Sequence, residues 1–314
     1  MKTESLRYLV PIPTPIPTST FAKRFFEKWM VILTLLGLRG CKDLGMLENG
    51  NSLLKFRKTS GIADKNEIIQ IPKDRIIYPL VRFFYDWGDT EAEFLSNGVK
   101  SALKIIEPSE LLFIDLGAHI GLVTLQTLRR VKEPIQAIAI EPQPRHVEAL
   151  THNCSKYIEK RTLEIYPHGL GARSCEQQIF TDEKNSGSGS FIRQAAYVSV
   201  QEDNLLSVIS SQDFEAEKLL QYKKFVIKSD IEGWDAEVLS NFSRTFWSKV
   251  EAAVVEIQPN SELDSLDFLV SEFLKFDFIS WVPFKNMKLS KIEIIQFWRS
   301  DLPEVRNLYL HRNH

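Results

Sequence analysis

The chain has 314 residues, a formal net charge of −2, 44% hydrophobic residues and 25% charged residues. This balance argues against a basic nucleic-acid binder and against an acidic disordered chain, and the length suits one α/β domain with an extension. Its three cysteines, Cys41, Cys154 and Cys175, are scattered and odd in number, so they show neither a disulfide framework nor a metal-binding spacing. We therefore expect a reducing, cytoplasmic compartment.

Residues 1–65 are expected to form an N-terminal extension, made of a proline-rich arm and an amphipathic helix. Alternating prolines at 10–17 favour an extended polyproline conformation. The apolar run at 29–38 has ten residues, whereas a helix needs about 20 to span a bilayer. Residues 21–40 therefore predict a helix that packs on the domain or on a partner chain, with contact to a membrane surface as the second interpretation.

The segment after residue 40 leads into the main domain, which we expect to occupy residues 66–314. Its polar, glycine-interrupted first part predicts a loop with short elements over 41–65. Beyond it, the residue pattern predicts two strands and a helix with an acidic first turn. These are strands at 67–71 and 75–84, and a helix at 90–106.

From residue 111 to residue 257, short apolar strands alternate with helical patterns. This alternation predicts an α/β fold with a doubly wound, mostly parallel, seven-stranded sheet, and a ligand site at the carboxyl ends of its strands. A loop rich in glycine and serine at 185–190 is expected to separate two hairpin strands. In chain order, we expect strands at 111–116, 135–140, 163–166, 177–181, 196–201, 225–228, 252–257, 278–283 and 307–311, and helices at 121–131, 145–156, 236–241 and 263–276, with another beginning within 205–210.

Three acidic residues each follow an apolar strand pattern: Asp115, Glu141 and Asp230. In the expected sheet, all three lie at the edge that faces a ligand. Burial of a carboxylate costs free energy unless the group has a partner or a ligand. Glu141 also lies 26 residues after Asp115, where a dinucleotide-binding fold places an acid for the ribose hydroxyls. The three acids together therefore predict a ligand site.

The turn after the first of these strands reads Gly117-Ala118-His119-Ile120-Gly121. Glycines let a ligand approach the backbone, and the start of the next helix offers free N–H groups. His119 replaces the middle glycine that makes room for a pyrophosphate in dinucleotide-binding turns. A ligand with a ribose and no phosphate, such as S-adenosyl-L-methionine, fits the turn better, and its cationic sulfonium suits an acid-lined cleft. An ordinary βα turn without a ligand is the alternative.

Several motifs in this order resemble the FkbM family of S-adenosylmethionine-dependent methyltransferases. They are F-I-D-L-G-A-H-I-G at 113–121, I-E-P at 140–142, H-G-L-G at 168–171, I-K-S-D-I-E-G at 227–233 and E-I-Q-P at 256–259. Each motif alone has little specificity, whereas the combination is specific and covers roughly residues 75–275. The resemblance implies a class I, Rossmann-like methyltransferase fold. It also implies methyl transfer, typically to a hydroxyl of a sugar or of a secondary metabolite.

The resemblance assigns a part of the site to each motif. The glycine turn would line the methionine end of the cofactor, the I-E-P motif would hold the ribose, the H-G motif would border the adenine, and the later acids would face the acceptor. The residues concerned are Asp115, Gly117, His119 and Gly121; Glu141 and Pro142; His168 and Gly169; and Asp230, Glu232 and Glu256. Ser188 is expected in an acceptor loop, with a plain hairpin turn as the alternative.

The chain departs from the family pattern at three places, the third being Glu202 before Asp203, where the family usually has leucine before an acid. His119 stands where the family usually has asparagine, a change that keeps a polar contact available. Trp234 and Asp235 stand where the family usually has a small residue and glutamate. This second change bears on the identity of the acceptor more than on cofactor binding.

Methyl transfer to oxygen requires alignment of the hydroxyl and removal of its proton. Asp230 and Glu232 are two residues apart on an expected extended segment, so both can face the acceptor, and either is a candidate general base. In the structural alternative, Asp230 caps the next helix and Glu232 pairs with Lys228 or an arginine. His119 is a second candidate base because histidine titrates near neutral pH. The acids show no metal-specific spacing, so no metal is predicted.

Two other functions remain open from the sequence. One is a nicotinamide-dependent oxidoreductase on the same type of sheet, which the missing middle glycine disfavours. The other is a non-catalytic methyltransferase-fold protein that uses its extension to bind a partner. For the enzyme, the expected partners are a small-molecule or glycan acceptor, and no nucleic acid. The expected location is the cytoplasm, with membrane association as the second interpretation.

Overall fold

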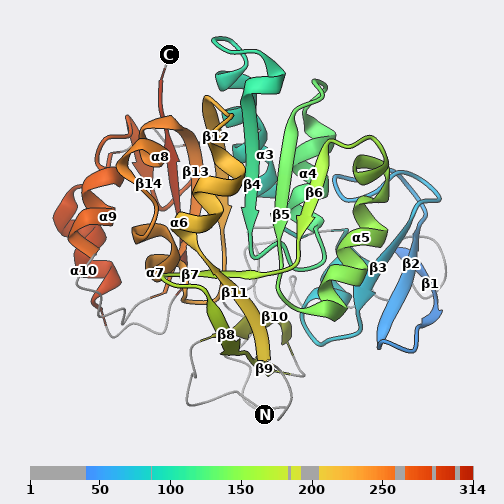
Figure 1. Cartoon of the computed structure of the whole chain (residues 1–314). Helices are drawn as coiled ribbons and strands as arrows, with labels where there is room; N and C mark the ends of the chain where they lie inside the picture. The colour runs from blue at the N-terminus through green and yellow to red at the C-terminus, as the bar shows by residue number, and fades with distance from the viewer. Residues whose placement is uncertain are drawn as a thin grey trace, which may run out of the picture.

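The structure is a computed structural model that describes residues 40–85, 87–182, 185–191, 205–258, 266–284, 288–300 and 305–313. At its centre lies a seven-stranded sheet with the strand order β14-β15-β13-β12-β4-β5-β6 (Figure 1). Its strands are β4 (Leu111–Leu116), β5 (Gln136–Ile140), β6 (Leu163–Tyr166), β12 (Lys224–Ser229), β13 (Val250–Ile257), β14 (Phe278–Ser280) and β15 (Arg306–His311).

The strand pairing of this sheet brings three candidate motifs to one edge. β4 lies between β5 and β12, and it runs parallel to both. The pairs β5–β6 and β12–β13 are also parallel, whereas β15 runs antiparallel to its neighbours β13 and β14. The seven-stranded, mostly parallel sheet is therefore confirmed. Because parallel strands share one direction, the carboxyl ends of β4, β5 and β12 meet.

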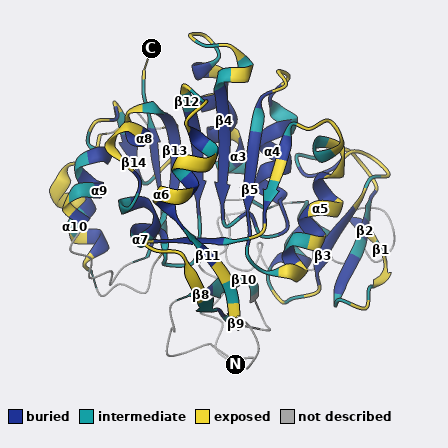
Figure 2. Cartoon of the chain, viewed as in Figure 1, coloured by how far each residue is buried: buried dark blue, intermediate teal, exposed yellow. Residues whose placement is uncertain are grey.

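Helices cover both faces of the sheet, as Figure 1 shows. All six residues of β4 are buried (Figure 2), as expected for a central strand covered on both sides. Phe113 packs in the core on one face, and Leu112 and Ile114 pack in the core on the other. The first face carries α3 (Asp89–Ala102), α4 (Leu122–Arg130) and α5 (Pro144–Glu159), and the second carries α6 (Ser211–Phe214), α7 (Asp235–Ser240), α8 (Arg244–Lys249), α9 (Leu266–Phe273) and α10 (Lys291–Trp298).

A small antiparallel sheet precedes these helices in the chain. It consists of β1 (Cys41–Met46), β2 (Asn51–Phe56) and β3 (Ile68–Pro72). The loop with short elements predicted at 41–65 contains two strands, β1 and β2. Leu54 and Phe56 of β2 enter the core, and its polar residues Asn51 and Ser52 are buried as well. β2 pairs with β3 across residue 65, and the division of the chain at that residue stays a prediction.

The proline-rich arm and the predicted helix within 21–40 lie outside the described residues. Across the ranges that the structure does describe, no helix combines the length and the apolar character needed to cross a membrane.

Two other predicted elements have a different structure. The strand predicted at 75–84 is instead α2 (Ile77–Pro79) followed by a π-helix (Leu80–Phe84). Its apolar residues fit either pattern, but Asp74 Oδ1 accepts hydrogen bonds from the backbone N–H groups of residues 76–78 and so starts a helix. The helix predicted to begin within 205–210 is β11 (Leu205–Ser210), and α6 starts just after it, capped by Ser210.

Short strands surround the carboxyl edge of the main sheet. β11 pairs with β7 (Gly169–Gly171) and β8 (Cys175–Gln178), and β9 (Phe180–Asp182) pairs with β10 (Asn185–Ser190). The glycine- and serine-rich stretch predicted as a loop is thus a paired strand. The strand predicted at 196–201 lies outside the described residues. A 3₁₀ helix (Pro108–Glu110) and a π-helix (Glu215–Leu219) complete the described elements.

Candidate active site

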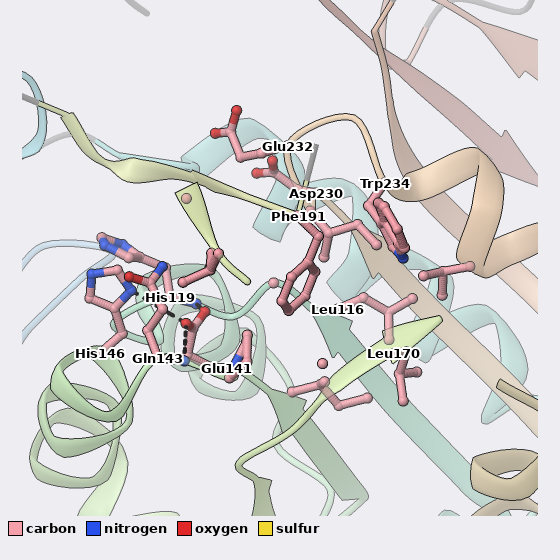
Figure 3. Close-up of a pocket in the computed structure, with 18 of the residues that line it drawn as sticks. Leu116, His119, Glu141, Gln143, His146, Leu170, Phe191, Asp230, Glu232 and Trp234 are labelled. Carbon is pink, nitrogen blue, oxygen red and sulfur yellow. Dashed lines mark hydrogen bonds and ion pairs between the residues drawn. The ribbon is translucent and has the colours of Figure 1, made fainter. Parts of the chain in front are cut away.

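A cavity of about 580 Å³, open to solvent, lies at the carboxyl ends of β4, β5 and β12 (Figure 3). Segments from β7, from the β9–β10 hairpin and from the start of α7 complete its wall. The lining residues are Leu116, Gly117, His119, Ile140, Glu141, Pro142, Gln143, His146, Gly169, Leu170, Ile179, Gly187, Gly189, Phe191, Asp230, Ile231, Glu232, Trp234 and Val238.

The turn after β4 is held against both neighbouring strands. Gly117 has φ +72°, and a Cβ atom there would lie 1.9 Å from the carbonyl oxygen of Asp230. The N–H groups of Gly117 and Ala118 donate to the carbonyl oxygen of Ile140, and the carbonyl of Gly117 accepts from Lys228 Nζ at 2.8 Å. The segment that follows β4 and the segment that follows β12 touch at this point. Only glycine fits there, because any Cβ atom would collide with the Asp230 carbonyl group.

His119 adopts a left-handed backbone conformation, with φ +50°. Asparagine and histidine are among the few residues other than glycine that favour this region. The conformation therefore gives a physical reason why histidine can occupy a position where the similar family usually has asparagine. Its ring Nε2 lies 3.3 Å from Ser186 Oγ on β10. Burial and the neighbouring His146 lower the pKa of His119 well below its usual value, which favours a neutral ring.

Glu141 is buried at the end of β5 and its carboxyl group is held by three neighbours. Oε2 accepts from the backbone N–H of His119, and Oε1 accepts from the backbone N–H of Gln143, both at 3.0 Å. His146 Nδ1, in the first turn of α5, lies 3.3 Å from Oε1. The acid predicted to hold a ribose therefore lies in the cavity wall with a fixed orientation.

Asp115 lies behind the cavity wall and is fully buried. Its carboxyl accepts a hydrogen bond from Thr124 Oγ1 and forms an ion pair with Lys228 Nζ at 3.4 Å. Burial raises the pKa of Asp115, and the Lys228 charge opposes that rise. The structure thus gives Asp115 a place beneath the glycine turn, where it faces Lys228 instead of the open cavity.

Asp230 and Glu232 lie together at the end of the cavity opposite Glu141 (Figure 3). The extended segment expected between them is wrong: β12 ends at Ser229, and the chain turns with Glu232 at φ +56° and Gly233 at φ +89°. Both acids nevertheless line the cavity. Lys228 forms an ion pair with Asp230 at 3.4 Å, whereas the structural alternative predicted that Lys228 or an arginine pairs with Glu232.

The Glu232 carboxyl group is in an unusual environment. Burial, followed by the charges of Asp230 and Asp235, raises its pKa to about 8. Gln258 Nε2 donates to Glu232 Oε2 at 3.4 Å and to Glu256 Oε2 at 3.3 Å. Burial and the neighbouring acids also raise the pKa of Glu256 well above its usual value. The Glu232 carboxyl group at this end of the cavity therefore takes up a proton near neutral pH, and the neighbouring Glu256 takes one up at a higher pH than an ordinary glutamate does.

The remaining predicted residues lie around this cavity. Gly169 lines it, and a Cβ there would lie 2.7 Å from the Phe191 ring. His168 packs its ring against Tyr166, with centroids 4.9 Å apart, and does not line the cavity. Gly121, at the N-cap of α4, and Glu256 also lie outside the lining set. Ser188 is on β10 between two lining glycines.

Among the described residues, no group of three or more His, Cys, Asp or Glu side chains is arranged to hold a metal ion.

Two apolar residues shape the middle of the cavity: Phe191 packs edge-on against Trp234, with ring centroids 5.8 Å apart. Together they provide a wall suited to a flat, largely apolar group.

The family profile described as the methyltransferase FkbM domain matches residues 115–280, which is more than half of the chain. The chain belongs to the FkbM methyltransferase family. The matched region contains every motif around the cavity, from Asp115 at the end of β4 to Glu256 at the end of β13. No curated protein matches the chain.

Solved structures similar to this FkbM-family chain include three methyltransferases. The methyltransferase FkbM from Methylobacillus flagellatus KT has 16% identity over 69% of this chain and 48% of its own, with a TM-score of 0.42. A putative O-methyltransferase from Klebsiella pneumoniae has 9% identity over 73% and 83% of the chains, with a TM-score of 0.38. A geranyl diphosphate methyltransferase in complex with SAM has 10% identity over 74% and 88%, with a TM-score of 0.39. The chain spans about half the length of the Methylobacillus protein.

Several residues of this FkbM-family cavity were missed by reasoning from the sequence. His146 and Gln143 follow the I-E-P motif closely, so their position in the first turn of the next helix was the available signal. Gln258 lies outside the lining set but contacts Glu232, and it could have been found the same way because it belongs to the E-I-Q-P motif. Phe191 gave no signal, because it follows a glycine- and serine-rich strand whose pairing the sequence did not predict.

Proposed function

We propose that the protein transfers the methyl group of S-adenosyl-L-methionine to a hydroxyl oxygen of a sugar or another small hydroxylated metabolite. One observation carries the proposal: a single cavity has a ribose-type acid, Glu141, at one end, and at the other end it has Asp230 beside Glu232, whose pKa is raised. The glycine turn separates the two ends. An acceptor hydroxyl near the acid pair would then lie close to the reactive end of a cofactor held by Glu141.

The residues of the cavity fit this cofactor. Gly117 and Gly169 leave space where a Cβ would meet a neighbouring residue, and Phe191 with Trp234 offers an apolar surface. Asp230 keeps 41% of its side chain exposed and supplies a negative charge at the acceptor end. Bound S-adenosylmethionine supplies an electrophilic methyl group on a cationic sulfur. A carboxylate near that position favours the cation electrostatically.

Glu232 is the proposed general base. A carboxylate with a pKa of about 8 holds a proton more strongly than an ordinary glutamate, so it is the better base once ionised. When the acceptor oxygen bonds to the methyl carbon, the methyl carbon–sulfur bond would break and leave S-adenosylhomocysteine, and the hydroxyl proton would move to a Glu232 carboxylate oxygen. Gln258 holds that side chain from one side, and the Ser190 hydroxyl donates to the backbone carbonyl of Glu232 at 2.7 Å.

The wider setting of the enzyme is also part of this proposal. A small-molecule or glycan acceptor and a cytoplasmic location agree with the near-neutral charge of the chain and with three free cysteines. Residues 21–40 remain proposed as a contact for a membrane surface or for a partner chain.

Cofactor binding is the first test. Calorimetry with S-adenosylhomocysteine is expected to give saturable binding, and NAD is expected to give none. Transfer of a labelled methyl group is then screened over glycans and small hydroxylated metabolites. Absence of binding at millimolar cofactor would remove the proposal, and binding of NAD instead would favour the oxidoreductase. Cofactor binding without transfer to any acceptor would favour the non-catalytic alternative.

A further inference from the structure

The Glu141 carboxyl group has nearly all of its acceptor capacity in use. An ionised carboxylate has about four lone-pair positions, two on each oxygen. Among the described residues, Oε1 receives the Gln143 N–H and faces His146 Nδ1, whereas Oε2 receives the His119 N–H. One position therefore remains, and it is on Oε2. The two oxygens of this acid are not equivalent, and the difference comes from His146.

His146 is held in place from several sides. Its side chain is 4% exposed, and its backbone N–H donates to the carbonyl of Gln143 at the start of α5. The ring of His119 packs edge-on against it, with centroids 4.2 Å apart. Figure 3 shows the two histidines together at one end of the cavity, beside Glu141 and away from Trp234. The ring therefore has little freedom to leave the carboxyl group.

We propose that His146 is a positioning residue that orients Glu141 for a ribose hydroxyl. The inference rests on the proposed cofactor, because it requires Glu141 to accept from a ribose. With its proton on Nδ1, the His146 ring donates to Oε1 and fixes the rotation of the carboxylate. The free position on Oε2 then accepts the hydroxyl. His146 contributes through Glu141, and it does not need to contact the cofactor.

The proposal makes ribose recognition depend on one imidazole N–H. Replacement of His146 by phenylalanine keeps a ring in the same space and removes the donor. Replacement by asparagine places an amide N–H close to the position of Nδ1. If the role of His146 were packing alone, the phenylalanine variant would be the milder change. If the role is orientation of Glu141, the asparagine variant is the milder one.

The experiment compares two ligands by calorimetry: S-adenosylhomocysteine and its analogue that lacks both ribose hydroxyls. Wild-type protein is expected to prefer the first by about 10-fold or more, since a hydrogen bond to a charged group contributes about 1.5–3 kcal/mol. His146→Phe is expected to remove most of this preference, with affinity for the analogue changed by less than about twofold. His146→Asn is expected to retain it. His152→Phe, on the exposed side of the same helix, is the matched control.

Other outcomes would overturn the proposal. Equal loss of affinity for both ligands in His146→Phe would assign the residue to packing, and an unchanged preference would show that Glu141 needs no orientation. If the phenylalanine variant does not fold, the comparison uses His146→Asn and His146→Gln, whose amide reaches the position of Nε2. Only the asparagine variant should keep the preference. Failure of the wild-type protein to bind either ligand would instead overturn the proposed function itself.

Discussion

At the scale of single residues, Glu232 combines backbone strain with an unfavourable electrostatic environment. Its left-handed backbone conformation, with φ +56°, costs about 1–2 kcal/mol for a residue other than glycine. Its side chain is half-buried and lies close to other acids. Residues held this way concentrate at functional sites, where the surrounding structure maintains them. The position of this strain agrees with the role proposed for Glu232.

Amide variants of the acid pair test that role. Glu232→Gln is expected to lower turnover by about 100-fold or more, because general base catalysis usually contributes that much. Asp230→Asn should have a smaller effect on turnover, since the ion pair with Lys228 partly neutralises the Asp230 charge. Methyl transfer and cofactor affinity are measured together, with Glu148→Gln on the exposed side of α5 as control. Unchanged turnover in the double amide variant would remove the catalytic assignment of both residues.

The rate should also depend on pH in a defined direction. A base must be ionised to accept a proton, and the Glu232 pKa of the free protein is about 8. We therefore expect kcat/KM to rise from pH 6 and to level off above about pH 8. A rate that stays flat across this interval in wild-type protein would contradict the assignment. In Glu232→Gln, the residual rate should lose this dependence.

Single residues differed in how far the sequence could predict them. The places of Glu141 and Asp230 in the cavity wall were predictable because each acid comes directly after an apolar strand, and Glu232 follows Asp230 by two residues. His146 was not, since its role depends on a 3.3 Å approach to Glu141 that sequence spacing does not define. The location of Asp115 beneath the turn, instead of in the cavity wall, depends on its pairing with Lys228 from the neighbouring strand.

At the scale of elements, Asn153 joins three parts of the fold. Its side chain, on α5, exchanges two hydrogen bonds with the backbone of Gln70 on β3, at 2.7 and 2.9 Å. It also donates to the carbonyl of Ile120 in the glycine turn at 2.9 Å. The small N-terminal sheet is thereby linked to the segment that shapes the cofactor end of the cavity.

Loss of the Asn153 side chain should affect both stability and binding. Asn153→Ala leaves buried backbone groups without partners, which costs about 1–3 kcal/mol for each such group. We expect a lower urea midpoint and weaker binding of S-adenosylhomocysteine. Thr151→Ala is the control, because Thr151 is exposed on the same helix and bonds only within it in the described structure. Equal midpoints for the two variants would show that the link contributes little.

Elements were predictable where burial on both sides makes a strand continuously apolar. β4, β5, β12 and β13 each contain an unbroken run of three or four buried apolar residues. The failures have a common cause. β1, β2, β10 and β11 lack the buried apolar run of a central strand, and β10 carries serine and glycine, so their strand character comes from hydrogen bonding to the strands beside them. Local sequence patterns contain little information about such pairing.

At the scale of the whole molecule, buried carboxyl groups gather around one buried lysine, Lys228. The pKa of Glu232 is raised to about 8 and that of Asp235 to about 7, in both cases chiefly by burial. Both values exceed those of the unfolded chain, which are about 4. The protonated forms therefore favour folding at low pH, and this contribution is lost as the pH rises through 7 and 8.

Stability should accordingly fall between pH 6.5 and pH 9. The lowered pKa of His119 changes stability only below about pH 6.5, where a histidine of the unfolded chain takes up a proton. It therefore does not mask the decrease expected in this window. Urea midpoints measured across the window are expected to decrease, and Glu232→Gln should decrease less, because it cannot ionise. A midpoint that rises or stays constant in wild-type protein would show that the buried acids are better compensated than these pKa values indicate.

The reversed strand β15 has a consequence for how the protein is made. β14 pairs with β15 and with no other strand of the main sheet, and β15 inserts between β14 and β13. During synthesis, β13 and β14 must therefore wait for residues 306–311 before the sheet can close, while the β4–β5–β6 half already has its partners. Domains that wait in this way expose unpaired strand edges. The nascent protein is thus most vulnerable to aggregation on the side of the sheet formed by β13, β14 and β15, whereas the half that contains Glu141 can form early.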